Sequence, residues 1–155
     1  MKISTSSLCA WAVLSLAFGA PSAYADTKGD KDRPNVENMT LTSRQVGGTS
    51  PDETISDLFD ERGNKIGFST TDCTVIKEAD PRAVQCHGSY VLEGRGEITW
   101  ENANRDQRPP HLRAITGGTG EFCEARGQIR VIRYVSDPQG GEYQLKVIKG
   151  RKCPV

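Results

Sequence analysis

Two charged residues on a glycine-rich segment are of the types that do chemistry. Glu121 directly follows a Gly-Gly-Thr-Gly run at residues 117–120, and Arg126 lies farther along the same segment. If Glu121 faces the mouth of a cavity, burial would raise the pKa of its carboxyl, which could then act as a general acid or base. Arg126 could hold an anionic substrate group or an oxyanion. The alternatives are a solvent-exposed turn carboxylate for Glu121 and a salt bridge to a neighbour such as Glu124 for Arg126.

Other kinds of chemistry find no matching pattern. The two histidines, His87 and His111, suggest no ligand pair, and the cysteines lack CxxC-like spacing, so we expect no zinc or other metal site. No Gly-Lys-Ser/Thr follows the glycine run, which excludes a P-loop, and no serine lies in a nucleophile-elbow pattern. We expect no cofactor.

The first 25 residues have the pattern of a signal peptide. Lys2 gives a basic start, residues 8–20 are an apolar run too short to span a bilayer comfortably, and residues 23–25 form an A-x-A cleavage site. Removal of residues 1–25 would leave 19 basic and 20 acidic residues, a balance that argues against a nucleic-acid or membrane-surface binder. We therefore expect a secreted, extracytoplasmic protein with a flexible leader at residues 26–35 and one domain at residues 36–155.

That domain reads as short β-strands separated by turns. Apolar and polar residues alternate at residues 84–92, 122–135 and 142–153, which is the period of a strand with one buried face. Further strands are expected within residues 36–46, 55–66, 67–76, 97–100 and 111–116, with a turn at 59–64. Residues 47–53 and 102–110 are expected to be loops, the second because Pro109-Pro110 removes ladder donors. Such a series predicts an antiparallel barrel or sandwich, and barrel closure removes exposed edges.

Four cysteines follow the signal peptide: Cys73, Cys86, Cys123 and Cys153. An even number in a small exported domain predicts two disulfides, for which three connectivities are possible, with buried free thiols as the alternative. A loop at residues 77–83 would place Cys73 opposite Cys86, and a turn at residues 137–141 would bring Cys123 near Cys153. We therefore predict the pairs Cys73–Cys86 and Cys123–Cys153.

The glycine-rich segment also resembles a known family. Residues 114–122 (AITGGTGEF), followed by Ala-Arg-Gly at 125–127, resemble the GGTG-x-F-x-x-A-R-G segment of dirigent proteins, and allene oxide cyclases carry a similar ITGG-x-G segment. Residues 59–67 and the GRGEITW stretch at 94–100 also resemble this family. The resemblance implies an all-β fold, an antiparallel eight-stranded barrel that is often trimeric. It implies binding of apolar small molecules and their cyclisation or coupling without a cofactor.

The resemblance also implies a role for Glu121, which occupies the position of a functional Asp in many dirigent proteins. The chain departs from the pattern in its first strand, because residues 41–46 contain neither the Asp of dirigent proteins nor the Glu of allene oxide cyclases. Half of the acid–base equipment of either group is therefore absent.

Three functions remain open. The first is a cofactor-free barrel that binds an apolar or phenolic small molecule and promotes its isomerisation or cyclisation, or steers its coupling. Glu121 and Arg126 would be its polar groups, and its cavity wall would include Tyr90, Trp100 and Phe122. The second is a lipocalin-like carrier, and the third is an exported structural or interaction module with a filled interior. A ligand-sized apolar cavity with convergent polar groups would favour the first. The family resemblance further implies a homo-oligomer, a trimer or a dimer.

Overall fold

In the computed structural model the described residues are 34–50, 52–77, 83–104, 108–136 and 139–150. The predicted signal peptide and nearly all of the predicted leader lie outside these ranges, as does Cys153. Among the described residues there is no helix with the length and hydropathy that a bilayer crossing requires.

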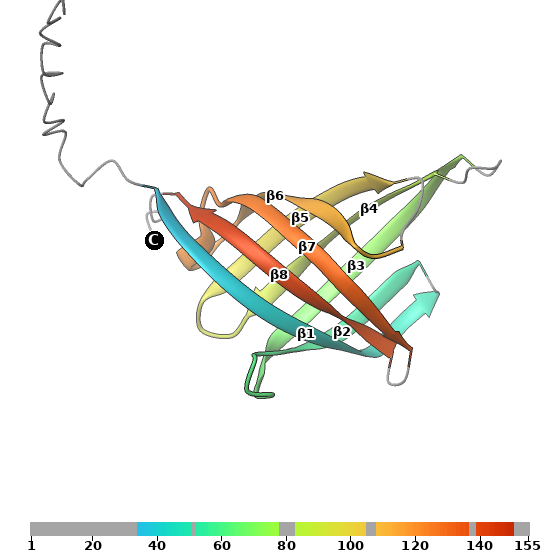
Figure 1. Cartoon of the computed structure of the whole chain (residues 1–155), viewed down its shortest axis with the longest axis horizontal. Coiled ribbons are helices and arrows are strands. Elements are labelled where there is room, and N and C mark those ends of the chain that lie inside the picture. The colour runs from blue at the N-terminus through green and yellow to red at the C-terminus, as the bar shows by residue number, and fades with distance from the viewer. Residues whose placement is uncertain (1–33, 51, 78–82, 105–107, 137–138, 151–155) are drawn as a thin grey trace, which may run out of the picture. The chain divides into compact units, whose positions relative to one another are not determined.

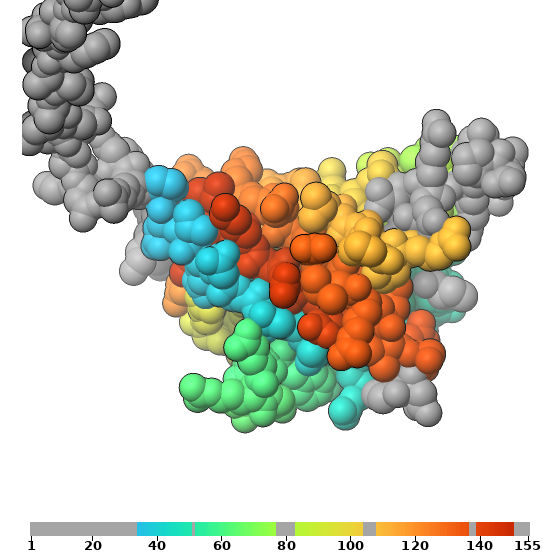
Figure 2. Space-filling view, viewed as in Figure 1, coloured from blue at the N-terminus to red at the C-terminus, as the bar shows by residue number. Residues whose placement is uncertain are grey.

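Eight antiparallel strands form a closed barrel, as predicted (Figure 1). Each strand pairs with the next along the chain, and β1 pairs with β8 to close the sheet. In the space-filling view β1, in blue, lies beside β8, in red, while the β2–β3 turn, in green, projects from the same face (Figure 2). The strands are β1 Asn35–Ser50, β2 Glu53–Phe59, β3 Lys65–Lys77, β4 Ala83–Leu92, β5 Gly96–Asn104, β6 His111–Gly118, β7 Arg126–Ser136 and β8 Gln139–Lys149.

The interior of the barrel is packed with apolar side chains from alternate strand positions. In β4 the predicted face is confirmed, because Val84, Cys86, Tyr90 and Leu92 are all buried. Gly88 belongs to the same face and leaves room for a ring, since a Cβ there would lie 2.7 Å from Cζ2 of Trp100. The largest fully buried side chains are Trp100, Tyr90, Phe122, Leu58, Ile98, Ile129, Val131, Val147 and Cys86.

The predicted strand at residues 122–135 was wrong at its start. Residues Gly120–Phe122 form a single 3-10 turn, and the chain reaches β7 only at Arg126. The reversal uses a hydrogen bond from the Ala125 N–H to the Phe122 carbonyl and a positive φ of 56° at Glu124. Cys123 and Ala125 are buried and Glu124 between them is exposed, so this alternation reflects a tight turn over the barrel end and not a strand.

Several other strands extend beyond their predicted bounds. β1 runs to Ser50 through the expected loop at residues 47–53, and β5 runs to Asn104 through the start of the expected loop at 102–110. Asn104 pairs with Val84 of β4, so the start of the expected loop is part of the β4–β5 ladder. Pro109 and Pro110 lie outside the ladders, as predicted.

A bulge in β7 reverses which side chains face the interior. Val131 pairs with Tyr143, but the next paired residue is Arg133, opposite Glu142, so Ile132 is the extra residue. The bulge turns Arg133 outward, where it forms an ion pair with Glu142 at 2.8 Å. It brings Tyr134 to the inner side at the end of the strand, because a one-residue slip exchanges the two faces.

The disulfide between Cys73 and Cys86 is confirmed. The two residues are direct partners in the β3–β4 ladder, with Cα atoms 4.0 Å apart. Cys123 is buried and disulfide-bonded, while Cys153 lies outside the described residues, so the second pairing stays a prediction.

Replacement of both Cys73 and Cys86 by Ala is expected to lower the free energy of unfolding by about 3 kcal/mol, because the bridge restricts a short loop in the unfolded chain. Urea denaturation of the variant and of the unreduced wild-type protein gives the difference. Equal midpoints would show that the unfolded chain gains no freedom when this bridge is removed.

Candidate functional site

The two ends of the barrel differ in how they are filled. We call one the Phe122 end, where β1 begins, β8 ends and the Gly120–Phe122 turn covers the interior. The other is the Arg113 end, where β6 begins and β7 ends and where Arg113 lies inside the barrel.

Phe122 closes its end of the barrel beneath a network of charges. Its side chain is completely buried, and the cations of Arg95 and Lys149 lie 4.9 and 5.3 Å from its ring centroid. Arg95 forms ion pairs with Glu37 at 2.9 Å and with Glu121 at 3.0 Å. Lys149 contacts the same two carboxylates at 2.6 and 3.3 Å. Four charged side chains are therefore paired with one another above a buried ring.

Glu121 lies in this network and not in a cavity. Hydrogen bonds from Arg95, and then from Lys149, hold the pKa of its carboxyl below its ordinary range. The sequence argument for acid–base chemistry required burial and a raised pKa, and the structure has an exposed carboxylate with a lowered one. This environment favours a permanently ionised partner for Arg95 and Lys149 at neutral pH.

Arg126 does not join Glu121. Its guanidinium donates hydrogen bonds of 2.7 Å to the carbonyls of Thr116 and Ala125, so it ties the end of β6 to the start of β7. The salt bridge to Glu124 that sequence reasoning offered as the alternative does not occur among the described residues either. The two polar residues singled out in the sequence are thus placed in separate structural contacts.

The network predicts an acid-dependent loss of stability. Burial alone would raise the pKa of Glu37, but hydrogen bonds from Lys149 and Arg95 outweigh it and lower the pKa below 4.5. A depressed carboxyl pKa stabilises the folded state above the unfolded value and ceases to do so as pH falls through the folded value. Glu37→Gln should therefore melt below wild type at pH 7, and the gap should shrink below pH 4.5.

Thermal melts of both proteins from pH 7 to about pH 3 measure this gap, since the window lies at the carboxyl pKa values. Glu101→Gln, at an exposed position on β5, is the control and should match wild type throughout. A gap that stays constant with pH would assign the effect of Glu37→Gln to packing.

The Arg113 end contains a cavity inside the barrel. Its volume is about 530 Å³, within the range of small-molecule sites. Its walls come from the inward positions of β1, β2, β3, β6 and β8 and from the end of β7. No Asp or Glu among the described residues lines it. The lining residues are Ser43, Gln45, Thr54, Ser56, Thr71, Cys73, Arg113, Tyr134, Val135, Ser136, Gln139, Gly140 and Tyr143.

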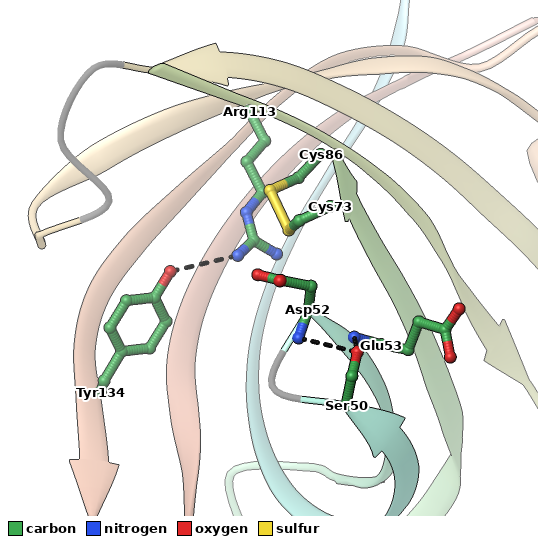
Figure 3. The surroundings of a disulfide bond; sticks show 7 residues. All are labelled: Ser50, Asp52, Glu53, Cys73, Cys86, Arg113 and Tyr134. Carbon is green, nitrogen blue, oxygen red and sulfur yellow. Dashed lines mark hydrogen bonds between the residues drawn. A yellow bond between two sulfur atoms is a disulfide. The ribbon is translucent and has the colours of Figure 1, made fainter. Parts of the chain in front are cut away.

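Arg113 is the charged group of this cavity. It is 7 % exposed and donates hydrogen bonds to the hydroxyl oxygens of Tyr134, at 3.3 Å, and Tyr90, at 3.5 Å. Figure 3 shows the guanidinium beside the Cys73–Cys86 disulfide and directed toward Tyr134. Burial raises the pKa of both phenols, so each remains protonated at neutral pH.

The floor beneath Arg113 is aromatic. The guanidinium carbon lies 4.0 Å from the ring centroid of Trp100 and 5.5 Å from that of Tyr143. Tyr90 lies between them, with its ring centroid 6.3 Å from Trp100 and 5.7 Å from Tyr143. Tyr90, Trp100 and Phe122, which sequence analysis assigned to a cavity wall, do not line this cavity. Tyr90 and Trp100 contact Arg113 from the packed interior, while Phe122 lies at the other end of the barrel.

A second hollow, of about 590 Å³, lies between β1 and the β2–β3 turn. It exists because β1 pairs with β2 only from Thr42 onward, so the first residues of β1 have no neighbour on that side. Several of its polar groups are already bonded. Asp60 accepts hydrogen bonds from the N–H groups of Arg62 and Asn64, and Arg95 belongs to the charge network. It therefore has less to offer a ligand than the Arg113 end.

Sequence analysis missed both Arg113 and Tyr134. The signal for Arg113 was available, because it shares strand parity with Ile115, which is buried. A cation in phase with a buried face is unusual enough to single out. Tyr134 could not be found in this way, since only the bulge at Ile132 brings it inward.

Comparisons with known proteins support the architecture. No family model and no curated protein matches the chain. Among solved structures, a pyocyanin demethylase superposes with a TM-score of 0.60 at 24% identity, over 72% of this chain and 99% of that one. Two pterocarpan synthase dirigent proteins superpose with TM-scores of 0.54, at 15% and 14% identity. The first match covers 79% of this chain and 88% of the dirigent protein. The second covers 77% of this chain and 99% of the dirigent protein.

At these identities the likeness concerns the fold alone. It confirms the predicted dirigent-like barrel, whereas the likeness to allene oxide cyclases stays a prediction.

Proposed function

We propose that this chain is an exported barrel protein that binds an apolar or phenolic small molecule in the cavity at the Arg113 end. The observation that carries the proposal is a cavity of about 530 Å³ that contains a buried guanidinium and has Tyr134 and Tyr143 in its wall. Ligand sites are hollows of this size in which a few oriented polar groups fix the ligand. Here most lining residues are hydroxyl or amide side chains, and Arg113 is the single charged group among them. The proposed export rests on the signal-peptide pattern and on the Cys73–Cys86 disulfide, since such bridges persist in oxidising compartments.

Any chemistry at this site would depend on position and charge. The described lining contains no carboxylate, so Asp or Glu acid–base catalysis has no group here. Arg113 and Tyr134 could stabilise negative charge that develops on a bound phenol or enol, while the walls hold one reactive conformer. Promotion of an isomerisation or steering of a coupling is therefore the catalytic form of the proposal, and a carrier without turnover is the alternative.

Occupation of the cavity can be tested by fluorescence. Trp100 is the sole tryptophan after residue 25, and it forms part of the floor under Arg113. Small planar phenols and aromatic compounds should change its emission in a saturable way when titrated into the processed protein. Substrate turnover, followed by chromatography of the same mixtures, separates the catalytic form from the carrier.

A matched pair of substitutions on β3 locates the site. Thr71 lines the cavity, and its neighbour Thr70 lies on the opposite face of the strand. Thr71→Phe should weaken binding by about tenfold or more, because the ring occupies ligand volume worth a few kcal/mol of contact. Thr70→Phe should leave the affinity unchanged. Equal affinities in the two variants would place the ligand elsewhere and reject the proposed site.

A further inference from the structure

The Arg113 end holds a buried cation without an anionic partner. Arginine stays protonated in proteins, and a buried charge is costly unless it is paired. Arg113 is 7 % exposed, yet no described Asp or Glu forms an ion pair with it. Arg95, at the Phe122 end, behaves differently, since it contacts two carboxylates.

Asp52 does not supply the missing charge. It lies just before β2 in the surroundings of the disulfide (Figure 3), and its backbone N–H donates to Oγ of Ser50 at 3.3 Å. No ion pair joins its carboxylate to Arg113 in the described part of the chain.

Several hydrogen-bond donors at the Arg113 end have no partner among the described residues. A guanidinium has five N–H donors, and Arg113 makes two long hydrogen bonds, to Tyr134 and Tyr90, while its Nε has no partner. Nε1 of Trp100 and the amide of Asn102 are likewise buried without a hydrogen-bond partner. Buried polar groups are nearly always bonded. Of these groups Arg113 lines the cavity, so its unsatisfied Nε indicates a place for an acceptor there.

The surroundings determine the shape of that acceptor. The faces of Trp100 and Tyr143 hold the guanidinium at 4.0 and 5.5 Å from their centroids, which leaves its N–H edge for an in-plane partner. A planar carboxylate matches two parallel N–H donors of arginine. Within the otherwise largely polar lining, Tyr134, Tyr143 and Val135 offer apolar surface for an aromatic body.

We propose that the ligand of the Arg113 end is a small aromatic carboxylate whose charge pairs with Arg113. This inference rests on the proposed function and names its ligand class. The neutral phenol Tyr134, at the lip of the cavity, contributes a hydrogen bond to the same group, and the neutral lining adds no competing negative charge.

The test compares two probes of nearly equal shape, 2-naphthoate and 2-naphthamide, by calorimetric titration of the processed protein at pH 7. The carboxylate should bind about tenfold or more tightly than the amide, because a hydrogen-bonded charge contributes about 1.5–3 kcal/mol. Arg113→Met should lower the affinity for 2-naphthoate to that for 2-naphthamide and leave 2-naphthamide unchanged. Arg130→Met, at an exposed position on β7, is the matched control and should preserve the wild-type preference.

The outcomes separate this inference from the proposed function. Equal affinity of wild type for both probes would overturn the inference while leaving a binding barrel in place. Binding of neither probe would remove the proposed ligand class and, if the fluorescence titrations are also flat, the proposed function. The wild-type comparison needs no substitution, so it stands even if Arg113→Met fails to fold.

Discussion

Phe122→Ala is expected to lower the free energy of unfolding by about 3–5 kcal/mol, among the largest losses a single substitution in this chain should cause. The ring is completely buried, and it is the part of the Gly120–Phe122 turn that fills the barrel end. Its removal would leave a void beneath Arg95 and Lys149, whose cations lie over the ring face. The turn itself would remain, because it is held by backbone hydrogen bonds.

Urea denaturation measures this loss, with Phe68→Ala as the control. Phe68 lies on β3 with 41 % of its surface exposed, so its truncation should cost well under half as much. The void lies at the opposite end from Arg113, and ligand affinity in the fluorescence titration should therefore persist in Phe122→Ala. A small loss of stability would mean that the turn collapses into the space, and a loss of binding would mean that the two ends are coupled.

The architecture could be predicted because the strands carry a regular signal. In β4 and β8 all buried residues fall at every second position, so the period of two in the sequence maps directly onto one face of the sheet. The pairing of Cys73 with Cys86 followed from the same regularity, since a short loop between two such strands places them opposite each other. The local sequence pattern was therefore sufficient to predict which residues face the interior wherever the strand pairing contains no bulge.

The candidate site was harder to predict than the fold, because its residues are positioned by irregularities in the strands. The bulge at Ile132 exchanges the faces of β7 and selects Tyr134 over Arg133 for the interior, and nothing in the local residue types specifies that slip. Residues 123–126, which follow the Gly120–Phe122 turn, alternate between buried and exposed as a strand does, although β7 begins only at Arg126. The role considered for Glu121 came from the resemblance to dirigent proteins and required it to face a cavity mouth. In the structure β6 ends at Gly118, and Glu121 contacts Arg95 and Lys149.

The distribution of charge divides the barrel into a structural end and a binding end. At the Phe122 end Glu37 and Glu121 balance Arg95 and Lys149, and a buried ring fills the interior. At the Arg113 end a cation is enclosed by aromatic rings and forms no ion pair with a described carboxylate. A chain selected for stability alone would have little use for that arrangement, because an apolar side chain of similar volume would fill the same space.

Arg113→Met is therefore expected to raise the free energy of unfolding of the ligand-free protein by about 1–4 kcal/mol, the range found when buried ion pairs are replaced by well-packed apolar residues, because Arg113 has no ion pair to offset its desolvation. Methionine is flexible and of similar length, so it can fill the space above Trp100 and remove the cost of an uncompensated cation. Urea denaturation without ligand gives the value, with Arg113→Ala as a control that removes the charge but leaves a void.

A higher free energy of unfolding in Arg113→Met, with a smaller increase or a decrease in Arg113→Ala, would show that the cation lowers the stability of the protein. Such a cost is expected of a residue that serves to bind a ligand. A loss in Arg113→Met of several kcal/mol would show the reverse. The contacts of the guanidinium with Trp100, Tyr134 and Tyr143 would then be sufficient to stabilise it, and Arg113 would be a structural residue of the barrel.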